Sequence, residues 1–242
     1  MKKFSIDYSF LIVLCLIALS PKQDTLVKLL IALCVHELGH LAWIGFFRYR
    51  IESLRLSIFG FFLKLDATKD ELFKDICIYY GGILANLLCF LFVPDPVFKK
   101  INLLFLCFNA LPIYPLDGFQ GIRCILAYFI PYQKVLKITA IFSMLSSTIA
   151  FVLCLCFKMD VFILLNSAYL IILSLEYYFK LKAIYQSFLL RRSLYPFEYP
   201  IKRIAFPDSI EGCFYKYHQV EFMIENKKIT EADLLLSKNM LK

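Results

Sequence analysis

Charged residues are scarce in this chain. Asp, Glu, Lys and Arg make up 19% of the 242 residues, and hydrophobic residues make up 60%. Soluble domains average about 25% and about 45–50% for the same two classes. With a mean hydropathy of +0.69, the composition argues against a soluble enzyme and favours an α-helical polytopic membrane protein.

The sequence lacks the patterns of a thiolate metal site and of a nucleic-acid-binding face. None of the nine cysteines forms a C-x-x-C pair, so there is no pattern for a thiolate metal site. The net charge of +8 belongs to residues 1–194, which hold 20 basic and 12 acidic side chains. Spread among apolar runs, these basic residues form no soluble basic face, and we expect no nucleic-acid partner.

Apolar runs predict about six transmembrane helices. They occupy residues 8–19, 26–47, 76–93, 97–111, 135–157 and 161–179. The first run is short, and we expect residues 4–7 to lengthen it; a cleaved signal peptide is the alternative. Of the 20 Lys and Arg residues up to position 194, 15 fall in segments that this arrangement puts on the same side of the membrane as the N-terminus. Both termini are therefore expected in the cytoplasm, with the chain in a bacterial-type cytoplasmic membrane.

Two segments depart from the helical pattern. Residues 52–66 alternate apolar and polar side chains around Gly60, which predicts a membrane-associated β-hairpin; an amphipathic loop is the alternative. From residue 195 the chain resembles a soluble protein. We therefore divide it into a transmembrane domain, 1–194, and a small α+β cytoplasmic tail, 195–242. Strands are expected at 201–206 and 220–224, with a turn at 226–228. Thr230 and Asp233 are then expected to open a helix as a capping box.

Histidine is rarer than the charged residues. The chain has three, and two lie in His36-Glu37-Leu38-Gly39-His40, inside the apolar run 26–47. Residues four apart share one face of a helix, so both imidazoles can reach one metal ion. Glu37 holds the position of the general base in an H-E-x-x-H zinc hydrolase. Such groups are costly in a lipid-length helix unless they function there; a chance pair on an interhelical face is the alternative.

A catalytic zinc site takes three protein ligands and keeps one open position. The candidate for the third ligand is Asp117, in a run that Pro112 and Pro115 break. Irregular backbone at membrane depth is tolerated where it lines protein or a cavity, although Asp117 could instead be a helix cap or turn residue. Asn109 could donate a hydrogen bond to substrate, or it could cap the broken helix.

Together, two motifs resemble the site-2 protease family of intramembrane zinc metalloproteases. They are the segment 36–40 and Asn109-Ala110-Leu111-Pro112-Ile113-Tyr114-Pro115-Leu116-Asp117-Gly118, and the resemblance covers roughly residues 5–185. It implies that His36, His40 and Asp117 hold one Zn²⁺ and that Glu37 is the catalytic glutamate. Residues 81–86 are similar to a small-residue stretch of the family, with Ile83 where proline is usual. Phe119 stands where many members have a second glycine.

The resemblance also implies a function. We expect a zinc-dependent intramembrane metalloendopeptidase that cleaves a membrane-embedded or membrane-tethered regulatory protein. The layout is similar to the sporulation branch of the family (the stage IV sporulation protein FB type), whose members process the precursor of a sigma factor. Inhibitor or activator proteins in the membrane, and a homo-oligomer, are left open as partners.

The tail resembles one half of a nucleotide-binding CBS pair. Its expected order is strand, helix, strand, helix, at residues 201–206, 210–217, 218–229 and 230–240. The alternative function is a non-catalytic polytopic protein that binds or transports a divalent metal. Because no other histidine lies in the apolar runs, the sequence gives no series of metal sites along a transport path.

Overall fold

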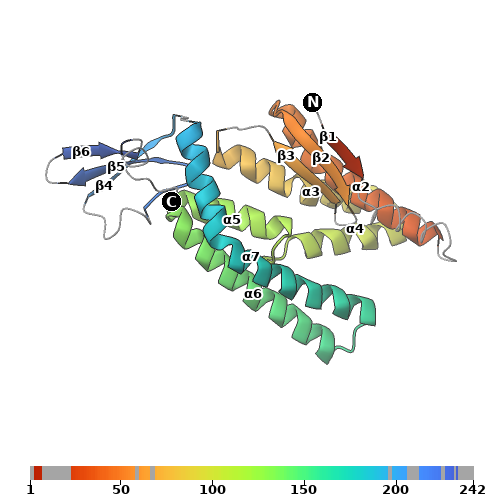
Figure 1. The fold of residues 1–242 in the computed structure, drawn as a ribbon. Helices are drawn as coiled ribbons and strands as arrows, with labels where there is room; N and C mark the ends of the chain where they lie inside the picture. Colours follow the sequence, from red (N-terminus) through yellow and green to blue (C-terminus); the bar gives the residue numbers. More distant parts are fainter. Residues whose placement is uncertain are drawn as a thin grey trace. The chain divides into compact units, whose positions relative to one another are not determined.

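The computed structural model describes residues 3–6, 23–57, 60–65, 69–195, 198–205, 213–224, 227–231 and 233. The chain divides into two compact units, Met1–Thr68 with Phe73–Ala110, and Lys69–Leu72 with Leu111–Lys242. Figure 1 shows the elements of each unit. The boundary expected at residue 194 stays a prediction.

The first unit combines a sheet with three helices. Strands β1 (Lys3–Ile6), β2 (Ile51–Ser57) and β3 (Gly60–Leu65) form a sheet in the order β1-β2-β3. Strands β2 and β3 are antiparallel, with Ser57 opposite Gly60, so the predicted hairpin is confirmed. Strand β1 pairs with β2 in parallel, Lys3 opposite Ser53. The prediction that residues 4–7 extend a helix is therefore wrong for residues 4–6, whose backbone belongs to the sheet. The predicted span 8–19 lies outside the described residues.

Three helices complete the first unit: α2 (Gln23–Phe46), α3 (Leu72–Phe92) and α4 (Pro96–Asn109). Helix α4 begins one residue before the predicted start at residue 97, and Asp95 caps it by accepting a hydrogen bond of 2.6 Å from the Phe98 N–H. Lys28 of α2 donates to the same carboxylate at 2.9 Å. Helices α2 and α4 share a buried apolar cluster, Ala32, Phe98 and Ile101. With 14 residues, α4 is about 21 Å long and is too short to cross a bilayer alone.

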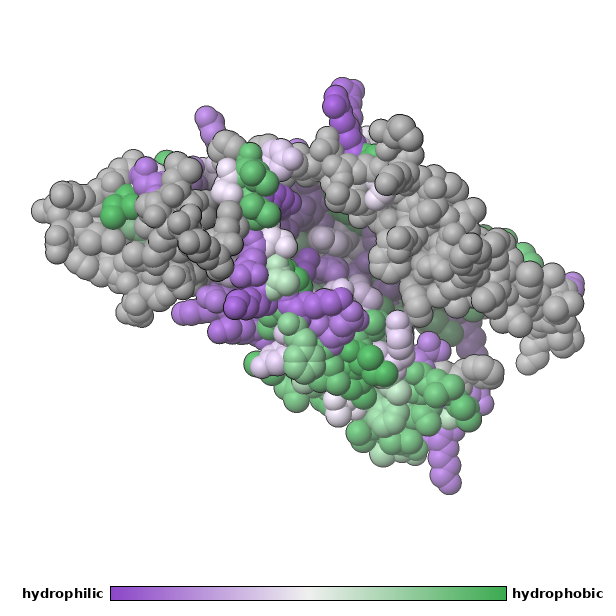
Figure 2. All heavy atoms as spheres, in the orientation of Figure 1, coloured by the Kyte–Doolittle hydropathy of each residue, from purple (hydrophilic) through white to green (hydrophobic). Residues whose placement is uncertain are grey.

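The second unit contains α5 (Asp117–Phe129), α6 (Tyr132–Cys156) and α7 (Val161–Leu194). Helices α6 and α7 pack together along their length (Figure 1). Hydrophobic residues cover the exposed face of this pair in Figure 2. On α6, Ile141, Leu145 and Ile149 follow one another at helical spacing and are 52%, 58% and 58% exposed, as apolar side chains that face lipid would be. Helix α5 was not predicted as a separate element.

Three described helices are long and apolar enough to cross a membrane: α2, α3 and α6. The protein is therefore a multi-pass membrane protein, mostly helical as predicted. Helix α7 covers the predicted span 161–179 and continues to Leu194, with two arginines in its last turn.

The tail forms a second small sheet. Strand β4 (Ile201–Ala205) pairs in parallel with β5 (Gln219–Ile224), which pairs antiparallel with β6 (Lys227–Thr230). The turn expected at 226–228 is wrong in part, because Lys227 and Lys228 pair with β5. The helix expected at 210–217 is also wrong over residues 213–217, which have no helical structure. The capping box is confirmed: the Thr230 N–H donates to Asp233 at 3.0 Å, and the Asp233 N–H donates to the Thr230 hydroxyl at 3.3 Å.

Candidate metal centre

The two histidines of the motif meet on one face of α2, as their spacing predicts. Their Nε2 atoms are 3.2 Å apart, and their rings meet edge to face with centroids 4.8 Å apart. Two nitrogens at 2.0–2.1 Å from a tetrahedral zinc ion lie about 3.3–3.4 Å from one another. The pair therefore has the separation that two ligands of a single ion require.

Each ring is oriented through its other nitrogen. His40 Nδ1 lies 2.6 Å from the backbone carbonyl oxygen of Ile78 on α3. A carbonyl can only accept, so Nδ1 carries the proton and Nε2 keeps its lone pair for a metal. His36 Nδ1 lies 2.6 Å from Asn86 Oδ1, also on α3. Metal-binding histidines commonly donate a hydrogen bond from their second ring nitrogen in this way.

Glycines let α3 approach the histidines closely. A Cβ on Gly82 would lie 2.5 Å from His40 Nε2 and 2.7 Å from His36 Nδ1. One position earlier, a Cβ on Gly81 would lie 2.7 Å from the carbonyl oxygen of Gly39, inside the H-E-x-x-H motif. Small residues at such crossings are a common feature of membrane helices. The sequence indicates close helix contact at these glycines and at Asn86, but not that the contact surrounds the histidine rings.

Glu37 is buried beside this pair, with 8% of its surface exposed. Leu38, the next residue on α2, is 59% exposed. The helix thus directs the glutamate into the protein and the leucine outward, although both stand in the same apolar run. An ionisable group kept inside a membrane helix indicates a functional site.

Asp117, the predicted third ligand, is the first residue of α5. A carboxylate in the first turn is stabilised by the helix dipole, and Leu116 occupies the cap position, so Asp117 is not the N-cap. The segment before it is anchored to α6, because the Tyr114 N–H donates to Ser143 Oγ at 2.8 Å. Ser143 in turn lies 2.8 Å from Ser174 Oγ on α7. His36 and His40 belong to the first unit and Asp117 to the second, and Asp117 as the third ligand stays a prediction.

Phe119 replaces the second glycine of the family pattern with a packing residue. Its ring lies 5.2 Å from that of Tyr177 and 5.6 Å from that of Tyr114, edge to face in both cases. Only 2% of Phe119 is exposed. This departure from the pattern therefore fastens the start of α5 to α7.

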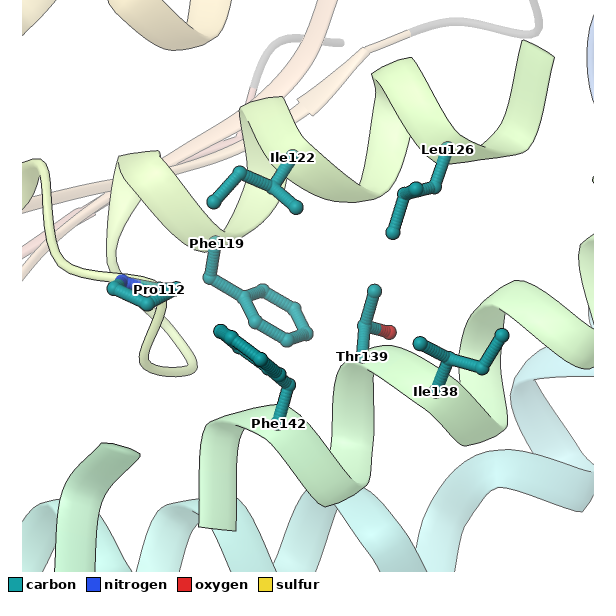
Figure 3. Close-up of a pocket in the computed structure, with 7 residues that line it drawn as sticks. All are labelled: Pro112, Phe119, Ile122, Leu126, Ile138, Thr139 and Phe142. Atoms are coloured by element: carbon teal, nitrogen blue, oxygen red, sulfur yellow. The ribbon is translucent and has the colours of Figure 1, made fainter. Parts of the chain in front are cut away.

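A small apolar cavity lies between α5 and α6 (Figure 3). It measures about 180 Å³ and is lined by Pro112, Phe119, Ile122, Leu126, Ile138, Thr139 and Phe142. The Thr139 hydroxyl is directed to its own helix, where it donates to the Val135 carbonyl at 2.8 Å. The cavity wall therefore presents no polar group that would orient a ligand.

Asn109 lies at the end of α4, where its side-chain amide donates to the Phe105 carbonyl at 3.1 Å. This bond lies within α4, whose C-cap is Ala110, so the capping role of Asn109 also stays a prediction. Its role toward substrate stays a prediction.

Comparison with known proteins gives a similar curated sequence and similar solved structures, and no family model matches the chain. It is 28% identical to stage IV sporulation protein FB of Bacillus subtilis (strain 168) over 129 residues, which is 48% of this chain and 45% of the relative. The chain thus spans less than half the length of that relative. A solved structure, the site-2 protease from Methanocaldococcus jannaschii, matches 72% of this chain and 90% of its own, with a TM-score of 0.53 and 21% identity.

These matches bear on the resemblance carried by the two sequence motifs. The solved structure aligns with most of the chain, and the similar curated sequence carries the name of the branch that the layout of the chain resembles. The resemblance to the site-2 protease family is therefore confirmed, and the fold of this chain is a site-2 protease fold.

Proposed function

We propose that this protein is an intramembrane zinc metalloprotease. The observation that carries the proposal is the histidine pair of α2, whose Nε2 atoms lie 3.2 Å apart beside a buried glutamate within a membrane helix. Similarity to a site-2 protease supports the same function. We assign one Zn²⁺ to His36, His40 and Asp117, because two imidazoles and one carboxylate leave the fourth tetrahedral position open.

The chemistry is divided between the ion and Glu37. When bound, zinc lowers the pKa of a coordinated water toward about 7 and polarises a scissile carbonyl. Glu37 is the general base: its carboxylate takes the proton of the attacking water and passes it to the leaving amine. Asn109 is proposed to donate a hydrogen bond to the substrate or to the developing oxyanion. Its contact with Phe105 would then be exchanged for one with substrate.

The proposed substrate is a membrane-embedded or membrane-tethered regulatory protein. Because the amides of a membrane helix are used in its own hydrogen bonds, the cleaved segment must unwind. Among the strands that the structure describes, β3 pairs with β2 alone in the order β1-β2-β3, so its outer edge can receive an extended segment. Likeness to a sporulation protein supports the processing of a membrane-bound precursor during sporulation.

We propose six spans with both termini in the cytoplasm of a bacterial-type membrane. Helices α2, α3 and α6 supply three of them. The other three would be formed by residues 8–19, by α4 with the broken segment, and by the first part of α7. The excess of Lys and Arg on the side of the N-terminus supports this orientation. Under this arrangement the tail is a cytoplasmic domain of residues 195–242.

The test replaces Glu37 with Gln. Purified variants are measured for bound zinc and for cleavage of tagged single-pass membrane proteins that accumulate in cells lacking this chain. Glu37→Gln should bind one zinc ion and lose cleavage, whereas Leu38→Ala, on the exposed side of the same helix, should keep both. Cleavage at the normal rate by Glu37→Gln would overturn the assignment of Glu37 as the base.

The alternative is a non-catalytic protein that binds or transports a divalent metal. It predicts that cells expressing the wild-type chain and cells expressing Glu37→Gln accumulate the same membrane proteins. A separate test of the ligands uses His36→Ala and Asp117→Ala, each of which should lose stoichiometric zinc. Zinc retained by Asp117→Ala would remove this residue from the site without affecting the roles of the histidines.

A further inference from the structure

Two buried asparagines connect the candidate metal centre to α4. Asn86 of α3 and Asn102 of α4 are each 0% exposed. Buried amides in helices of a membrane protein are costly unless each polar atom has a partner. Neither residue has a part in the proposed chemistry, and Asn102 lies outside both sequence motifs.

The two amides form a chain of hydrogen bonds that ends at His36. Asn102 Nδ2 donates to the backbone carbonyl of Phe98 at 2.8 Å. Asn102 Oδ1 accepts from Asn86 Nδ2 at 2.8 Å. Asn86 Nδ2 also donates to the backbone carbonyl of Ala32 at 3.2 Å. Asn86 Oδ1 lies 2.6 Å from His36 Nδ1.

Two backbone carbonyls determine the direction of every hydrogen bond in this series. The Phe98 carbonyl can only accept, so the Asn102 amide must present its NH₂ group there and its oxygen to Asn86. Asn86 must then present its NH₂ group to Asn102 and to the Ala32 carbonyl. Its oxygen is therefore the atom that faces His36, and a flipped Asn86 would oppose oxygen to oxygen at two places.

The direction of these hydrogen bonds selects one tautomer of His36. Facing an oxygen, His36 Nδ1 must carry the proton, and Nε2 keeps the lone pair that a metal binds. We propose that Asn102 is a positioning residue for the metal ligand His36, acting through Asn86. This inference rests on the metal site of the proposed function and not on the proteolysis.

A purely structural role is the competing explanation, since the same bonds join α2, α3 and α4. The two explanations differ at His40. His40 has its own acceptor, the Ile78 carbonyl, and needs no asparagine. Positioning by Asn102 therefore predicts a change at His36 alone, whereas loosened helix packing would change both rings.

The experiment uses the full chain in lipid nanodiscs with ¹⁵N-labelled histidine. The chain has three histidines, so the tautomers of His36 and His40 can be read from their ring nitrogen shifts at a pH where the rings are neutral. His40→Ala and His36→Ala assign the signals. Zinc affinity is measured separately by competition with a chromophoric chelator.

Asn102→Leu should give a mixture of His36 tautomers and about 10-fold weaker zinc binding, the lower end of what loss of such supporting contacts costs. Asn102→Asp should restore both values, because a protonated carboxyl can donate to the Phe98 carbonyl and accept from Asn86. Asn86→Leu, which removes the acceptor itself, should weaken zinc binding further. His40 should keep its tautomer throughout.

An unchanged His36 tautomer in both Asn102→Leu and Asn86→Leu would overturn the proposal, as would equal changes at His36 and His40. Failure of the proposed function looks different. If the wild-type chain binds zinc and cleaves no membrane protein, the protease assignment fails while the tautomer result stands. If the wild-type chain binds no zinc, the proposed function and the role of Asn102 toward a metal ligand both fail.

Discussion

Replacing Gly82 with Ala should disrupt the histidine pair directly. The added methyl would lie 2.5 Å from His40 Nε2, 2.6 Å from His36 Cε1 and 2.7 Å from His36 Nδ1. Carbon and nitrogen atoms in contact are normally about 3.5 Å apart, so each ring must move by close to 1 Å. Both rings are held by hydrogen bonds of 2.6 Å, to Asn86 and to the Ile78 carbonyl. Movement would therefore break or stretch the two bonds that orient the ligand atoms.

The magnitude follows from these losses. Two hydrogen bonds contribute about 0.5–1.5 kcal/mol each, and overpacking costs about 1–3 kcal/mol. Against this, Ala gains about 1 kcal/mol over Gly in a helix interior. The sum is a net loss of about 1–5 kcal/mol, and its midpoint of about 3 kcal/mol corresponds to roughly 140-fold weaker zinc binding.

The assay is chelator competition for zinc with the purified chain, and Gly45→Ala is the matched control. Gly45 lies in α2 of the same unit, and a Cβ there would have no atom within 4 Å. Gly45→Ala should therefore bind zinc as the wild type does. Equal zinc affinity in Gly82→Ala and Gly45→Ala would refute the reasoning, because the close approach of α3 would then place no demand on the rings.

Three further predictions concern charged groups outside the candidate metal centre. Arg192→Met should destabilise the tail by about 3–5 kcal/mol, seen as faster amide exchange in β5, because it leaves the buried Glu231 without the guanidinium 3.1 Å away. Burial raises the pKa of Glu231 above 4.5, so tail stability should fall as pH rises from 4.5 through that raised pKa; Glu231→Gln should abolish this slope in a pH series of exchange rates. The Phe98 N–H, with Lys28, lowers the pKa of Asp95 below 3.8. Its contribution to α4 should therefore be present above pH 3.8 and be lost as pH falls through the lowered pKa, and Asp95→Asn, which keeps a capping oxygen, should remove that dependence in thermal unfolding.

Local patterns predicted most of the elements correctly. Helices α2, α3 and α6 begin and end within four residues of the apolar runs that predict them. The hairpin and the capping box at Thr230 also follow the sequence, because alternation and capping depend on residues near one another in the chain.

The errors fall where a distant strand or helix decides the structure. Residues 4–6 stand beside an apolar run, yet they pair with β2 about 50 positions away. One further error is local: Lys227 and Lys228 have turn-like neighbours, yet they pair with Ile224 and Met223 of the adjacent strand β5. Helix α5 follows a segment that two prolines interrupt, and its first turns are fixed by Tyr177 of α7, which the sequence pattern does not indicate.

The sequence by itself determined the chemical groups of the candidate centre, because the two histidines and Glu37 occupy one helix and their relation needs only helical periodicity. Tertiary structure decided the state of those groups. The tautomers of His36 and His40 depend on Asn86 and the Ile78 carbonyl, 50 and 38 residues away along the chain. Hydrogen bonds of this kind arise only when α3 packs against α2, and that close approach in turn requires a bare backbone at Gly82.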